Sequence, residues 1–248
     1  MRKFLFLPLL ALLASCGKNE DCDIVTPQPE DLVSPALYAT LSQSSTDPYN
    51  GPLEVLPCET NGSFYIGNYT AKGKQVPFPA YYLITNGIGK SQKYPLRLPV
   101  GTYNVIYWGY PDYFGTAGDA YLADPTLIIG KKLNTTSLGL RKIPGDTVYY
   151  PIHSLVYGTQ NINIGKDDLQ AHLKHASAAL SVIVSETNGD AFSDAIDSMW
   201  IYISNIYSNL NYFSARPEGT FKTISFGLKP STNRTEFNNN FVSVFPSQ

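Results

Sequence analysis

Short runs in which every second residue is apolar recur along most of the chain, and Gly, Pro and Asn-Gly turn signals separate them. A period of two is typical of strands with one buried face, especially where β-branched and aromatic residues gather. The pattern predicts strands at Ser63–Tyr69, Ala80–Thr85, Thr102–Trp108, Thr126–Ile129, Thr147–Pro151, Leu155–Ile164, Ala178–Ser185, Ser198–Ser204, Thr220–Leu228 and Phe241–Phe245.

One turn signal is strong enough to predict a hairpin. Asn86-Gly87 follows Ala80–Thr85, and both central residues of such a turn need positive φ, which Asn and Gly tolerate. We expect it to join Ala80–Thr85 to Tyr94–Leu98. Helix-like patterns occur at Lys166–His175 and Asp190–Asp197 only. The fold class predicted from these patterns is all-β.

The first residues form a secretory signal. Met1-Arg2-Lys3 is basic, Phe4–Leu13 is apolar, and Leu13-Ala14-Ser15-Cys16 ends the stretch with small residues before a cysteine. An apolar run of this length is too short to cross a bilayer, which takes about 20 residues. The ending resembles the lipobox of bacterial lipoproteins, so we expect Cys16 to be acylated and to begin the mature chain. An ordinary cleaved signal with a chance Cys16 is the alternative.

The residues after Cys16 predict a tether on the cell surface. Gly17–Asp23 is acidic and resembles the signal that exports some Gram-negative lipoproteins to the outer face of the outer membrane; a solvated tether would look the same. Asp23–Leu53 is rich in Pro, Ser, Thr and Gln, which favours a linker with one early strand near Ala36–Leu41.

Charge and cysteine content limit the partners and the chemistry. Removing residues 1–15 leaves 16 basic and 20 acidic residues, a net charge of −4, which disfavours nucleic acid as a partner. Cys22 and Cys58 would lie in an oxidising compartment, where they could form a disulfide; a free thiol at Cys22 is the alternative. Their spacing is not that of a zinc knuckle.

No pattern in the sequence predicts catalysis, a metal or a cofactor. Gly89-Lys90-Ser91 resembles the end of a phosphate-binding loop, but the first glycine of that motif would fall at Ile84. His172 and His175 lack a third ligand nearby. A G-x-S-x-G motif is also missing, so we expect a non-enzymatic protein.

An aromatic segment is the strongest candidate for a contact site. Tyr107–Gly115 contains Trp108, Tyr110, Tyr113 and Phe114 among Gly, Pro and Asp. Such a loop could stack against sugar rings or a partner subunit. The alternative is that Tyr107 or Trp108 fills the core, because strand alternation buries one of each adjacent pair.

Several strands resemble those of a known family. Leu98–Gly109, with its Pro-Val-Gly-Thr-Tyr opening and Trp-Gly end, is similar to a strand of the fimbrillin-associated anchor proteins, which hold fimbriae on the outer membrane of anaerobic Gram-negative bacteria. Leu173–Val184, Leu155–Gly158 and Ile201–Asn211 fit the same family. The resemblance implies two tandem transthyretin-like β-sandwich domains, an outer-membrane location and fimbrial subunits as partners.

The expected organisation is a signal peptide (1–15), a tether and linker (16–52), an N-terminal sandwich (53–165) and a C-terminal sandwich (166–248). The last of these is shorter than the roughly 100 residues of a complete sandwich, so we expect it to lack a final strand and to expose an edge. Fimbrial shaft subunits of this type are cut by an Arg-specific protease. The lack of arginine between Arg2 and Arg97 therefore favours an anchor or accessory subunit.

Two functions from different classes follow. The first is a fimbrial anchor or accessory subunit in cell adhesion, which joins other subunits by β-strand addition. The second is a surface glycan-binding lipoprotein of a nutrient-uptake system, in which the Trp108 and Tyr110 loop would contact the sugar.

Overall fold

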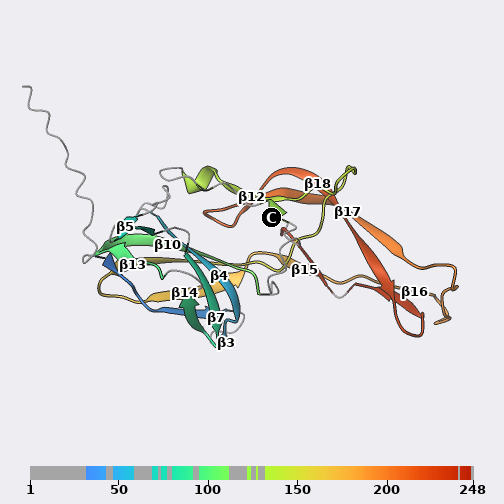
Figure 1. Cartoon of the computed structure of the whole chain (residues 1–248). Helices are drawn as coiled ribbons and strands as arrows, with labels where there is room; N and C mark the ends of the chain where they lie inside the picture. Colours follow the sequence, from blue (N-terminus) through green and yellow to red (C-terminus); the bar gives the residue numbers. More distant parts are fainter. Residues whose placement is uncertain are drawn as a thin grey trace, which may run out of the picture.

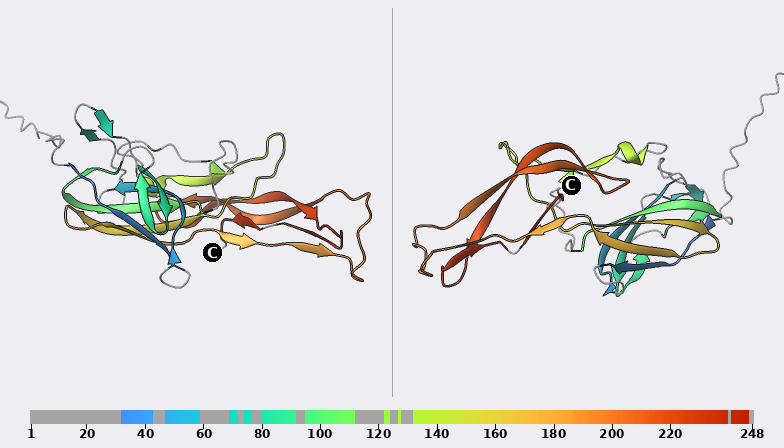
Figure 2. Two further views of the ribbon diagram at one scale, coloured as in Figure 1. Left: turned by 60° about the horizontal axis from the view of Figure 1, so that its bottom comes forward. Right: turned by 180° about the vertical axis from the view of Figure 1, so that it is seen from behind.

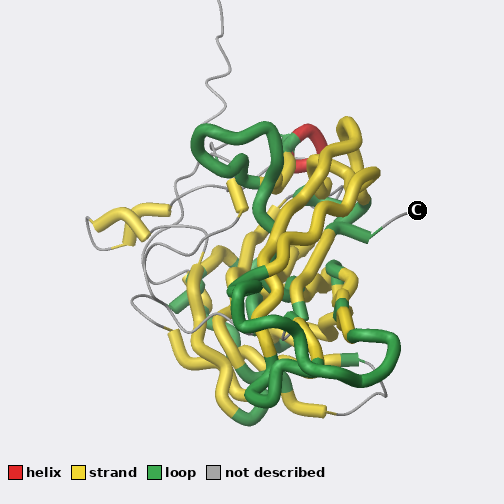
Figure 3. The backbone as a smooth tube through the Cα atoms, turned by 90° about the vertical axis from the view of Figure 1, so that its right-hand side faces the viewer, coloured by secondary structure: helices red, strands yellow, loops and turns green. Residues whose placement is uncertain are grey.

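The structure is a computed structural model, and it describes residues 32–42, 47–58, 69–71, 74–76, 80–91, 95–111, 122–123, 127, 132–239 and 241–246. Within these ranges there is no α-helix; the one helical turn is the 3-10 turn η2 (Leu133–Thr135), red in Figure 3. The all-β prediction is confirmed. None of the helices in the described ranges has the length and hydropathy of a membrane span.

The first sheet closes on itself. Its order is β14-β13-β10-β4-β7-β8-β2-β3, and β14 also pairs in parallel with β2. A closed sheet buries the edges that an open sheet exposes. Its strands are β2 (Leu37–Leu41), β3 (Asp47–Pro48), β4 (Gly51–Cys58), β7 (Ala80–Thr85), β8 (Ile88–Ser91), β10 (Gly101–Gly109), β13 (Val156–Ile164) and β14 (Leu169–His175).

The second sheet is open. Its order is β11-β12-β17-β18-β19-β16, and its longest strands, β17 and β18, carry it away from the first sheet (Figures 1 and 2). Its strands are β11 (Leu122–Ala123), β12 (Ser137–Leu140), β16 (Ile183–Ser185), β17 (Met199–Asn211), β18 (Pro217–Pro230) and β19 (Glu236–Asn238). Three small pairs complete the fold: β15 (Ala178–Leu180) with β20 (Val242–Val244), β1 (Leu32–Val33) with β9 (Leu98–Pro99), and β5 (Tyr69–Ala71) with β6 (Lys74–Val76).

Strand alternation explains the core of the first sheet. On β7, Ala80, Tyr82 and Ile84 are buried while the residues between them are exposed, as expected for a strand with one face on the core. β10 differs, because the four residues Val105–Trp108 are all fully buried. Both faces of β10 are therefore covered.

The Asn86-Gly87 turn is confirmed, but its partner strand was wrong. Asn86 has φ 49° and Gly87 has φ 77°, the positive values that the turn requires. A two-residue turn pairs the residues directly beside it, so Thr85 faces Ile88 and the hairpin partner is β8. Of the expected partner Tyr94–Leu98, the described residues 95–98 do not pair with β7, and Leu98 pairs with β1 instead.

Both predicted helices are wrong. Lys166–His175 contains strand β14, in which Leu169, Ala171 and Leu173 point inward; the four-residue spacing of the two leucines imitated a helix, and Ala171 between them reveals the strand. Asp190–Asp197 is a loop held by the Arg234 guanidinium, which donates to the carbonyls of Ser193 and Ile196.

The strands of each sheet also differ from those expected from the predicted linker and domain boundaries. The early strand near Ala36–Leu41 is confirmed as β2, and residues 32–52, expected to be linker, contribute β1, β2 and β3 to the sheets. β13 and β14 flank Gly165 and pair with each other, so the chain leaves the first sheet after His175. β11 and β12, which precede β13 in sequence, pair in the second sheet, so no single point in the chain separates the two sheets. The division into two domains stays a prediction.

Candidate functional site

The two sheets meet at a joint built from aromatic rings. Tyr212 lies in the turn that follows β17, and its ring stacks on the indole of Trp108 with 5.4 Å between the ring centroids. Trp108 Nε1 donates a hydrogen bond to the Tyr212 carbonyl at 3.0 Å. From β13, the Tyr157 hydroxyl donates to the Phe213 carbonyl in the same turn. The second sheet is thus fastened to the first by its β17–β18 turn.

A buried carboxylate belongs to this joint. Tyr212 Oη donates to Glu54 Oε2 at 2.7 Å, and the Glu54 side chain on β4 is almost fully buried. Burial and the nearby Glu54 carboxylate raise the pKa of Tyr212 well above its usual value. Burial raises the pKa of Tyr157 to about 12, with a smaller contribution from Cys58. Both hydroxyls therefore stay protonated, as donors must, at neutral pH.

The predicted aromatic contact site is wrong at Trp108 and stays a prediction at its other residues. Trp108 is fully buried in the joint, so the core alternative holds for it and its ring is not available to a ligand. Tyr110 is half-buried and packs against the core. Tyr113 and Phe114 lie outside the described residues.

The predicted lipid and disulfide sites stay predictions. Cys16 and Cys22 lie outside the described residues. Cys58 is buried at the end of β4, where its Sγ donates to the Asn104 carbonyl at 3.2 Å. His172 Nδ1 lies 3.0 Å from Thr40 Oγ1. Across the described ranges, no group of three His, Cys, Asp or Glu side chains could hold a metal ion.

The segment from Ala178 to Ser185, which we call the edge strand, pairs with described strands on one side only. β15 pairs with β20 and β16 pairs with β19, both on the same side of the segment. The Asn239 side chain fills the gap between these pairs: it accepts from the Val182 N–H at 2.6 Å and donates to the Leu180 carbonyl at 3.0 Å.

Backbone groups alternate in direction along a strand, so those of Ser181 and Ile183 point to the other side. No described strand pairs with the edge strand there. The edge strand therefore offers free N–H and C=O groups to a further strand.

The apolar face beside the edge strand is incompletely covered. Its residues pack against the core but are only half-buried, whereas Val105–Trp108 in the first sheet are fully buried. They are Leu180, Val182, Val184, Met199, Ile201 and Ile203. This face has room for more apolar side chains.

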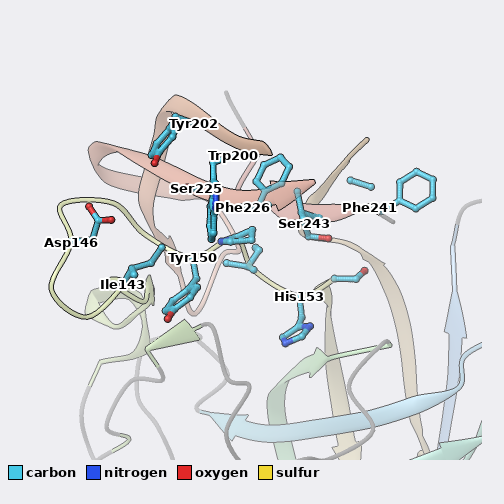
Figure 4. Close-up of a pocket in the computed structure, with 16 residues that line it drawn as sticks. Ile143, Asp146, Tyr150, His153, Trp200, Tyr202, Ser225, Phe226, Phe241 and Ser243 are labelled. Atoms are coloured by element: carbon cyan, nitrogen blue, oxygen red, sulfur yellow. The ribbon is translucent and has the colours of Figure 1, made fainter. Parts of the chain in front are cut away.

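A cavity of about 950 Å³ lies on the second sheet, and we call it the Trp200 cavity. In Figure 4, Trp200 and Tyr202 project from β17, and Tyr150 and His153 lie below them. Ser225 and Ser243 add hydroxyl groups to its lining. Sequence reasoning missed this site, although a signal was present: Trp200 and Tyr202 alternate with Ile201 and Ile203, so both faces of one strand are apolar.

Comparison with known proteins identifies the family. The model of the fimbrillin-A associated anchor proteins Mfa1 and Mfa2 matches residues 26–248. The fimbrial anchor protein Mfa2 from Porphyromonas gingivalis shares 13% identity at a TM-score of 0.50, over 86% of this chain and 73% of that one. A candidate adhesin from Bacteroides ovatus shares 13% identity at a TM-score of 0.53, over 88% and 70%. Comparison with curated proteins gave no match.

The two kinds of match carry different weight. At 13% identity the solved structures show that the fold is shared and no more than that. The family match covers almost the whole chain, including both sheets and the joint between them. The resemblance inferred from the Leu98–Gly109 strand is thereby confirmed, and the chain belongs to the fimbrillin-A associated anchor proteins.

Proposed function

We propose that this protein is a non-enzymatic fimbrial anchor or accessory subunit, held in the outer membrane by acylated Cys16 and joined to the next subunit by strand addition. Its family supports the role in adhesion. The observation that carries the joining step is the open edge strand from Ala178 to Ser185.

An incoming strand would gain two things at this edge. Its backbone would pair with the outward N–H and C=O groups of Ser181 and Ile183, which gives affinity with little dependence on sequence. Its inward side chains would extend the apolar face formed by Leu180, Val182 and Val184, which is now half-exposed.

The rest of the fold suits a load-bearing link. The edge strand begins near the first sheet at β15 and runs away from β10 and β13 to β16 (Figure 1). The joint of Trp108, Tyr157 and Tyr212 connects that part to the first sheet. A tension applied to the second sheet therefore passes through buried contacts rather than through a single strand of chain.

A proline tests the edge directly. Ile183 is exposed, and its N–H points away from β19, so Ile183→Pro removes a donor that the folded protein does not use. We expect cells with Ile183→Pro to lose attached fimbriae into the medium, counted by electron microscopy, while the protein itself stays on the cell. Ile183→Thr is the matched control, because it changes the side chain and keeps the N–H. Fimbriae retained by Ile183→Pro, with an unchanged melting temperature, would refute strand addition at this edge.

A separate experiment tests the proposed anchoring through acylated Cys16. Cys16→Ala should release the protein and its fimbriae together, detected in the culture medium by immunoblotting. If the protein leaves and the fimbriae stay, it is not their anchor.

A further inference from the structure

We propose that the Trp200 cavity is a binding site for neutral carbohydrate, with sugar rings stacked on Trp200 and Tyr202. This goes beyond fimbrial attachment: Ala179 of the edge strand lines the cavity, but Ser181 and Ile183, whose backbone groups would pair with an incoming strand, do not.

Two large aromatic rings are exposed side by side. Trp200 is 60% exposed and Tyr202 is 61% exposed, although each could bury a large apolar area. They are two residues apart on β17, so they share one face at a spacing of about 6.7 Å. Exposed apolar surface of this kind, set in a cavity with polar groups at its rim, marks a binding site.

Small residues keep the rings accessible. Gly227 on β18 lies opposite Trp200, and Ser225 lies opposite Tyr202. A Cβ built at Gly227 would meet no atom nearer than 3.9 Å, so the space beside the indole is open. Phe241, which is 71% exposed and has φ 74°, also lines the cavity. For a bulky residue such a φ is strained, as often seen at ligand sites.

The polar side chains that line the cavity indicate which class of ligand it binds. Ser225, Ser243 and Tyr150 provide hydroxyl groups and His153 provides an imidazole. Among the described residues of the lining, Asp146 is the one carboxylate and no Lys or Arg contributes. An anionic ligand would have no cation to pair with. Sugar rings combine apolar C–H faces with hydroxyl edges, which match aromatic faces and polar side chains respectively. The volume of about 950 Å³ lies within the range of small-ligand sites and accommodates more than one ring.

The two tryptophans of the chain make the test specific. Trp108 is fully buried and Trp200 is exposed, so quenching of the intrinsic fluorescence by acrylamide reports mainly on Trp200. The probes are neutral oligosaccharides of glucose, mannose, galactose, xylose and N-acetylglucosamine, with polygalacturonate as the anionic comparison. We expect at least one neutral oligosaccharide to protect Trp200 from acrylamide and to give a calorimetric Kd, and polygalacturonate to do neither.

Three variants complete the experiment. Trp200→Ala should weaken binding at least about tenfold, the loss expected for one stacked ring. Gly227→Val should abolish binding without lowering the melting temperature, because its side chain fills open space beside the indole. Phe221→Ala is the matched control: it removes an exposed aromatic ring of β18 outside the cavity, and should bind as the wild type does.

Two results would overturn the proposal: no neutral oligosaccharide protects Trp200, or Trp200→Ala and Gly227→Val bind as tightly as the wild type. Release of fimbriae by Trp200→Ala, with no sugar bound by the wild type, would make the cavity a subunit contact instead. Ile183→Pro separates this proposal from the proposed function, since it should release fimbriae and leave sugar binding unchanged.

Discussion

The hydrogen bond from Tyr212 to Glu54 should account for a measurable part of the stability that connects the two sheets. Tyr212→Phe removes the hydroxyl that donates to Glu54 Oε2 at 2.7 Å and leaves the ring stacked on Trp108. The Tyr81 hydroxyl lies 3.5 Å from Glu54 Oε1, too far to replace it. A hydrogen bond to a charged group contributes about 1.5–3 kcal/mol, and the burial of Glu54 places this one in the upper half of that range.

Urea unfolding followed by tryptophan fluorescence gives the free energy of unfolding of each variant. We expect Tyr212→Phe to lower it by about 2–3 kcal/mol in the wild type. In a Glu54→Gln background the same change should cost about 1 kcal/mol, because the acceptor is then neutral. Tyr202→Phe, at an exposed position, should change stability by less than about 0.5 kcal/mol. If Tyr212→Phe lowers the free energy of unfolding equally in the wild type and in Glu54→Gln, the hydrogen bond is not one to a charged carboxylate.

Three further changes probe packing and ionisation. Trp108→Ala should lower the free energy of unfolding by about 3–5 kcal/mol in urea, because it empties a fully buried site. Gly158→Ala should lower the free energy of unfolding by about 1–3 kcal/mol, because its Cβ would lie 2.8 Å from the His172 carbonyl oxygen. Gly227→Ala is the comparison: its Cβ would lie in open space, so the free energy of unfolding should hardly change. The pKa of Tyr157 is raised from 10.0 to about 12, so its contribution is complete below pH 10 and is lost as pH rises through 12. Thermal melts should show the stability advantage of the wild type over Tyr157→Phe shrinking by about 2 kcal/mol between pH 10 and pH 12.

Local rules identified strands such as β7, β10, β13, β17 and β18, because their alternation is visible in residues close in sequence. They missed β4 and β12, and the strand predicted at Thr147–Pro151 is wrong, since Tyr149 forms only isolated bridges there. Asn86-Gly87 defines its hairpin through the φ values of those two residues, and the alternation of Ala80, Tyr82 and Ile84 defines β7. β14 was misread because its apolar positions, Leu169 and Leu173, fit both a helix and a strand; its parallel pairing with β2 decides for the strand. That partner lies more than 130 residues away, beyond any local window.

The candidate sites were harder to predict because burial is a property of the whole fold. Trp108 and Trp200 both lie on alternating aromatic strands, and the sequence gives no reason to prefer either as a surface residue. The two side chains differ in burial because the turn that contains Tyr212 covers Trp108, whereas Trp200 stays exposed. Which side of the edge strand is paired could not be predicted either, because β19 and β20, which occupy it, lie more than 50 residues further along the chain.

The parallel pairing of β2 with β14 also determines how the first sheet resists pulling. The chain enters β2 at Leu37, and after β14 it leaves for the second sheet at His175, at the opposite end of the neighbouring strand. Tension between these two points slides the strands along each other instead of peeling them apart. All the hydrogen bonds from the Ala36 carbonyl to the Ser42 N–H then share the load and must break together. The closure that hides the edges of the sheet would thus also resist shear if the proposed tether were pulled, once β1 had separated from β9.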